Sequence, residues 1–116
     1  MALDKIKINR QIPKQEWLEF FDTFTNGNCG RKIAIEIVDR EFGDEQLIQE
    51  APLFGITYDP VGKGNDITIS TGRDEASYSH RINAPKEVWT GQDENGVVLA
   101  IKITDGQGNQ SIMTLK

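Results

Sequence analysis

The chain has 116 residues, of which 37% are hydrophobic and 27% charged, a size and composition that predict one globular domain. Its 13 basic and 18 acidic residues give a net charge of -5, and no cluster of Lys and Arg supplies the cationic surface that nucleic acid or an anionic membrane would need. Because Cys29 is the single cysteine and the N-terminus lacks the apolar segment of a signal peptide, we expect a cytoplasmic protein without disulfides.

The first predicted elements are a short strand over Lys5–Ile8 and a helix that begins at Pro13. Proline suits the first turn of a helix, where its missing N–H costs nothing. Trp17, Phe20, Phe21 and Phe24 follow at the spacing i, i+3, i+4 and i+7, which places all four on one helical face. The sequence Asn26-Gly27-Asn28 predicts the end of the helix.

After the helix the hydrophobic pattern changes to the alternation of β-strands. Pro52 predicts a break or a sheet edge between two of these strands, and Asn95-Gly96 predicts a tight reverse turn. Strands this close in sequence must be mainly antiparallel, because parallel neighbours need long crossovers. The expected strands cover residues 32–39, 47–48, 53–58, 66–71, 78–82, 85–91, 97–103 and 111–115.

These elements predict an α+β fold in which one amphipathic N-terminal helix packs on a curled, mainly antiparallel sheet of about six to seven strands. One helix cannot cover both faces of such a sheet, so a roll or a partly open barrel is expected, with the aromatic helix face closing one side. The element order is similar to that of the Sm-like barrel. Fold does not determine function, so this similarity predicts no activity.

The sequence predicts no catalytic residue, no metal site and no cofactor. Cys29 and His80, each the single residue of its type, form the one Cys/His pair that could supply a nucleophile and its base. We interpret Cys29 as a loop residue and His80 as a partly buried, hydrogen-bonded residue. Two such residues are too few for a zinc site.

Binding is therefore the leading functional hypothesis. Tyr58 and Trp89 are expected near strand ends with partial exposure, and aromatic residues beside Arg73 or Arg81 are typical of protein-binding hot spots. This pattern predicts a non-catalytic module that contacts an unidentified protein, with a homodimer through a strand edge as one form of that contact. The alternative is a small-ligand or weakly catalytic pocket around His80, Tyr78 and Arg81.

Four stretches of the chain resemble a family of small bacterial proteins that is known only as a domain of unknown function. The resemblance spans most of the chain, from about Arg10 to the C-terminus, and it implies no reaction, cofactor or site residue. It rests on the helix signature of residues 12–24, the strand signatures of residues 53–59 and 66–69, and His80-Arg81-Ile82 with Pro85.

Overall fold

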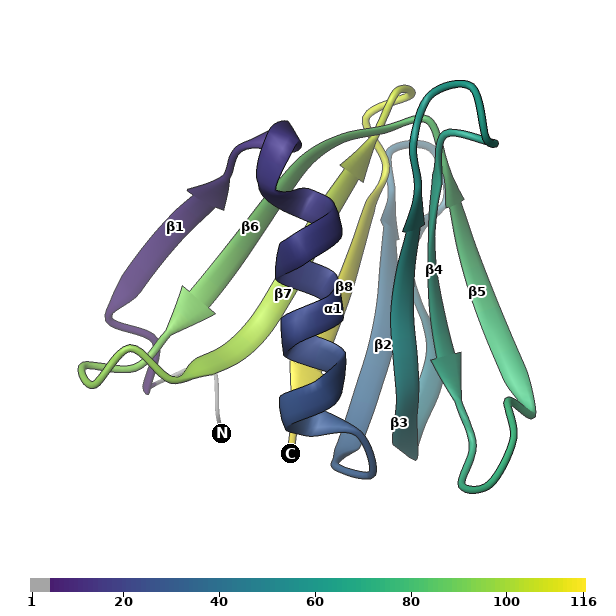
Figure 1. Cartoon of the computed structure of the whole chain (residues 1–116). Helices are drawn as coiled ribbons and strands as arrows, with labels where there is room; N and C mark the ends of the chain where they lie inside the picture. Colours follow the sequence, from purple (N-terminus) through teal and green to yellow (C-terminus); the bar gives the residue numbers. More distant parts are fainter. Residues whose placement is uncertain (1–4) are drawn as a thin grey trace.

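The computed structural model describes residues 5–116 and has one α-helix and eight strands (Figure 1). The expected α+β class is confirmed, with eight strands where about six to seven were predicted. In chain order the elements are β1 (Ile8–Ile12), a 3-10 turn (Lys14–Glu16), α1 (Trp17–Asn28), β2 (Lys32–Asp39), β3 (Gly43–Asp59), β4 (Asp66–Thr71), β5 (Tyr78–Asn83), β6 (Pro85–Gln92), β7 (Val98–Asp105) and β8 (Gln110–Leu115).

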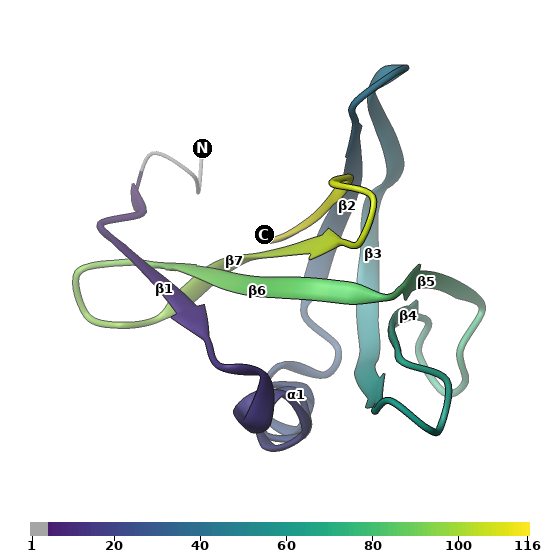
Figure 2. The same ribbon diagram turned by 90° about the horizontal axis from the view of Figure 1, so that it is seen from above.

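The strands form one antiparallel sheet in the order β1-β6-β7-β8-β2-β3-β4-β5. The sheet curls around its core but does not close into a barrel (Figure 2). The predicted strand at Lys5–Ile8 is displaced, because β1 begins at Ile8.

The predicted break at Pro52 is wrong, since β3 runs unbroken through this residue. Pro52 instead marks a change of partner: β3 pairs with β2 as far as Pro52 and with β4 from Leu53 onward. The proline has no N–H to donate, but its carbonyl accepts a hydrogen bond of 3.0 Å from the N–H of Gly72. A long strand that changes partners at a proline gives the sheet its bend.

The aromatic face of α1 packs against the concave side of the sheet, as expected. Trp17, Phe21 and Phe24 are buried and Phe20 is partly buried. The indole N–H of Trp17 donates to the carbonyl of Ile12 at 2.9 Å. Its ring meets that of Tyr58 edge to face, with 5.2 Å between ring centroids. The helix itself begins at Trp17, after the 3-10 turn that follows Pro13.

The helix also satisfies the backbone of β3 where β2 no longer flanks it. The hydroxyl of Thr25 accepts a hydrogen bond of 2.9 Å from the N–H of Ile56 and donates one of 3.2 Å to the carbonyl of the same residue. One side chain of α1 thus takes the place of a neighbouring strand at this point.

Alternation along the strands separates an inner face, which meets the helix, from an outer face on the opposite side. The inner face forms the core and is almost entirely aliphatic and aromatic. The outer face mixes apolar and charged side chains, and it contains the first candidate site. Buried residues of the inner face on the strands include Ile33, Ile35, Ile56, Ile67, Ile69, Ile82, Val88, Ile101, Ile103, Met113 and Leu115.

Candidate functional site

The outer face of the sheet carries a row of four side chains that mixes apolar and charged groups. Register places Trp89 of β6 beside Lys102 of β7, Lys102 beside Ile112 of β8, and Ile112 beside Glu36 of β2. All four are only partly buried. Large apolar side chains on a sheet face that no helix covers are a feature of interaction surfaces.

Beside this row lies a hollow of about 430 Å³, which we call the outer groove. Its floor is low because Gly91 and Ala100 stand opposite one another in the register. A Cβ at Gly91 would lie 2.6 Å from Cδ1 of Ile6, so glycine lets the N-terminal segment approach the sheet. The lining residues are Ile6, Asn9, Glu36, Trp89, Thr90, Gly91, Ala100, Lys102 and Ile112.

Trp89 is held in one orientation within the groove. Its indole N–H donates to Oε1 of Glu87 at 3.1 Å, and the amide of Gln11 on β1 reaches the same oxygen at 3.4 Å. A fixed aromatic side chain loses little conformational entropy when a ligand covers it, because its rotamer is already set. The groove therefore offers a rigid aromatic surface beside the cationic side chain of Lys102, with the anionic side chain of Glu36 at the far end of the row.

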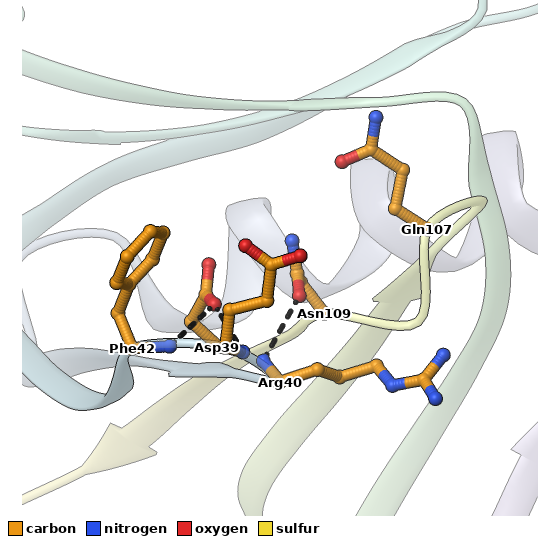
Figure 3. A pocket seen from close by; sticks show the side chains of 6 residues that line it. Asp39, Arg40, Phe42, Gln107 and Asn109 are labelled. Carbon is orange, nitrogen blue, oxygen red and sulfur yellow. Dashed lines mark hydrogen bonds between the residues drawn. The ribbon is translucent and has the colours of Figure 1, made fainter.

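The turn between β2 and β3, residues 39–43, forms a second feature, the hairpin tip (Figure 3). One carboxylate oxygen of Asp39 accepts hydrogen bonds from the N–H groups of Glu41 at 2.7 Å and Phe42 at 3.0 Å. The backbone N–H of Arg40 donates to Oδ1 of Asn109 at 3.3 Å. These contacts shape the turn so that the Phe42 ring points away from the Arg40 guanidinium, and Phe42 is 87% exposed.

The third feature is a second hollow, of about 310 Å³, which contains His80 and lies between β5 and the ends of β2, β7 and β8. The Nε2 atom of His80 is 3.0 Å from the hydroxyl of Ser111 on β8, so the pair joins the edge strand β5 to the middle of the sheet. Desolvation by burial lowers the pKa of His80 below its ordinary value of 6.5. The imidazole is therefore neutral at pH 7 and can either accept a hydrogen bond from Ser111 or donate one to it.

A neutral histidine beside a serine hydroxyl is part of the arrangement that activates a nucleophile. Ser111 is only 6% exposed, however. Among residues 5–116, no acidic side chain forms a hydrogen bond with His80 that would orient its ring. The pair can bind a small polar group at the hollow, but it does not reproduce the third member of a catalytic triad.

The structure separates the residues that the sequence analysis grouped as binding candidates. The expectation for Tyr58 is wrong. This residue was predicted to be partly exposed, but it is only 8% exposed because its ring packs against Trp17. Tyr78 and Arg73 are exposed. Arg81 directs its guanidinium to the carboxylate of Asp66, at 3.5 Å.

The pocket around His80, Tyr78 and Arg81 stays a prediction, and the structure shows where these three residues lie. His80 and Arg81 line the same hollow, and Tyr78 is not among its lining residues. Trp89 belongs to the outer groove instead. Cys29 and His80 have different hydrogen-bond partners, since the thiol donates to the carbonyl of Phe54 at 3.5 Å.

Sequence reasoning did not single out Phe42, Lys102, Ile112 or Ser111. Alternation could have placed Lys102 and Ile112 on the face opposite Ile101 and Met113, but only the strand order shows that they are neighbours.

Within residues 5–116, no group of three or more His, Cys, Asp or Glu side chains is arranged to hold a metal ion. In the same part of the chain, no helix has the length and apolar character needed to cross a membrane.

Comparisons with known proteins identify the family but no activity. Residues 8–116 match the model of the family of unknown function DUF5335, and the chain belongs to that family. It is 30% identical over 107 residues to an uncharacterised protein of Aquifex aeolicus (strain VF5), an alignment that covers 92% of this chain and 91% of the relative. No solved structure matches the chain. The resemblance seen in the sequence to an uncharacterised family is thereby confirmed.

Proposed function

We propose that this member of the DUF5335 family is a non-catalytic binding module that acts by contacting another protein chain through the outer groove. The observation that supports this proposal is the position of Trp89, which is partly exposed and hydrogen-bonded in one orientation on a sheet face that α1 does not cover. Tryptophan is among the residues most enriched at the energetic centres of protein interfaces.

The chemistry around Trp89 supports a protein ligand. Ile6, Ala100 and Ile112 supply apolar area, while Lys102 and Glu36 supply one charge of each sign. An apolar centre with a charged rim is the usual composition of a protein–protein contact. The exposed thiol of Cys29, which forms no disulfide, fits a reducing compartment, so we place this contact in the cytoplasm.

The test is affinity capture from the native host at physiological protein level with three forms of the protein. The wild type and Tyr78→Ala, which removes an aromatic side chain that is 37% exposed on β5, should capture the same partner. Trp89→Ala should lose it while its melting temperature changes little. Equal capture by Trp89→Ala, or the absence of any partner for the wild type, would contradict the proposal.

A second candidate function is the binding of a small polar ligand at the His80 hollow. It is supported by the neutral imidazole, the Ser111 hydroxyl and the polar side chains of Asp39, Asp105 and Asn109 that line the space. Nuclear magnetic resonance of the imidazole during titration with a metabolite panel tests it. A ligand of this site should shift the His80 signals in the wild type and lose affinity in Ser111→Ala, whereas flat titrations across the panel would refute it.

A further inference from the structure

We propose that the chain which occupies the outer groove is a second copy of this protein. In the symmetric dimer that we infer, the hairpin tip of each copy inserts Phe42 into the groove of the other. This inference rests on the proposed function, because it names the partner of the same groove. Three features of the molecule support this dimer: the placement of the tip, the size of the groove and the distribution of charge.

The hairpin tip and the groove lie on the same side of the sheet. In Figure 2 the helix is below the sheet, and the β2–β3 hairpin projects above it, away from the helix. Glu36 of β2 lines the groove, and the chain continues from there to the tip. A two-fold axis between tip and groove therefore places each tip over the other copy's groove, as a self-complementary interface requires.

The two features also match in size and character. Phe42 has the largest exposed fraction among the large hydrophobic side chains of residues 5–116. The groove is partly apolar through Ile6, Ala100 and Ile112, and its hollow of about 430 Å³ exceeds the volume of one phenylalanine side chain. The ring of Trp89 lies there as an aromatic partner, and aromatic pairs gain energy beyond their buried area.

Charge distinguishes a second copy from other partners. The N-terminal wall of the groove, which Ile6 lines, carries Lys5 and Lys7 on either side of that residue. The hairpin tip and the first residues of β3, residues 39–45, carry four carboxylates, of Asp39, Glu41, Asp44 and Glu45, against Arg40 alone. Strands β6, β7 and β8 lie between β1 and β2. At the usual spacing of neighbouring strands, β1 and β2 are therefore about 19 Å apart. The two charged regions are thus on opposite sides of the groove.

A two-fold axis exchanges these sides. It brings the acidic tip of one copy to the basic wall of the other, twice in each dimer. Opposite charges in this arrangement stabilise the symmetric pair and steer its formation. A partner with a uniformly acidic or uniformly basic surface would be repelled by one of the two walls.

The first test measures the mass of the wild-type protein in solution by sedimentation equilibrium up to about 100 µM, which would reveal a dimer with any dissociation constant below that value. We expect twice the mass of the chain. Phe42→Asp should weaken the dimer by at least about 100-fold, because two buried phenylalanines are replaced in each dimer. Val61→Asp is the matched control, since Val61 is also an exposed apolar turn residue, and it should leave the mass unchanged.

The second test exchanges charges between the two regions. Lys5→Glu with Lys7→Glu makes both regions acidic, and Asp44→Lys with Glu45→Lys makes both predominantly basic. All four residues are exposed, so both variants should fold. Each should be monomeric alone. Mixed in equal amounts, they should form a one-to-one dimer, because each acidic tip then meets a basic wall and each basic tip an acidic wall.

The outcomes separate this inference from the proposal on which it rests. A wild-type monomer, or a dimer that neither Phe42→Asp nor the charge exchange affects, overturns the inference. If the monomer still captures a different host protein and Trp89→Ala abolishes that capture, the groove is a binding site for another partner. If Trp89→Ala also has no effect on capture, the proposed function fails as well.

Discussion

Thr25 is predicted to connect the helix to the sheet through its hydroxyl rather than through its bulk. Thr25→Val keeps the shape of the side chain but removes the oxygen, so the N–H of Ile56 loses its acceptor and the carbonyl of Ile56 loses its donor. Ile56 is 1% exposed, so water cannot replace the lost partner without rearrangement. At about 1–3 kcal/mol for each of the two unsatisfied buried groups, the substitution should lower the free energy of unfolding by about 2–6 kcal/mol.

Thr25→Ser is the matched control because it retains the oxygen and removes one methyl group. That methyl lies 3.1 Å from the position of a Cβ at Gly55, so it contacts the strand closely. Its loss should cost about 1 kcal/mol. Urea unfolding followed by circular dichroism gives both values. If Thr25→Val is as stable as Thr25→Ser, the hydroxyl does not secure β3 and the interpretation is refuted.

Three further predictions concern stability. Gly72→Ala should lower the free energy of unfolding by at least about 3 kcal/mol, since φ at Gly72 is +145° and a Cβ there would lie 2.0 Å from the backbone carbonyl oxygen of Glu75. Gly27→Ala is the control, because a Cβ at Gly27 would have nothing within 4 Å. It should be neutral or stabilising in thermal unfolding. Trp17→Ala should cost about 3–5 kcal/mol as a core truncation, and Trp89→Ala much less, which calorimetry distinguishes. The third is a dependence on pH. The pKa of His80 is lower in the folded protein than its unfolded value of 6.5, so the unfolded chain binds the proton first: stability should be complete above about pH 6.5 and fall as the pH decreases from there toward the folded pKa. His80→Gln should remove that part of the decrease, and equal profiles for the two proteins would contradict it.

The helix and most strands could be predicted because their signals are local. The spacing of Trp17, Phe21 and Phe24 and the alternation around Ile101 arise from the periods of helix and strand, and both patterns correspond to buried faces in the structure. Pro52 shows the limit of local reasoning. Its missing donor predicts a break, but the strand changes partners at this residue and so avoids the loss of a ladder hydrogen bond.

The candidate sites could not be predicted in the same way, because each joins residues from distant parts of the chain. His80 and Ser111 are 31 positions apart, and no periodicity links them. Tyr58 has the composition of a surface aromatic at a strand end, and only the approach of Trp17 buries it. Lys102, Ile112 and Glu36 become one row only when the order β7-β8-β2 is known.

The two faces of the sheet differ in how closely their side chains are packed. Side chains of the inner face are packed against α1 and against one another, so substitutions there act first on folding. The row from Trp89 to Glu36 lies on the other face, where partly exposed side chains contribute less to the core. One helix leaves one face of the sheet uncovered, and in this chain that face has a fixed tryptophan and a groove lined by the opposite charges of Lys102 and Glu36. Lys5, Lys7, Asp44 and Glu45 are all exposed, so the exchange of their charges is expected to change association and to leave the free energy of unfolding nearly unchanged.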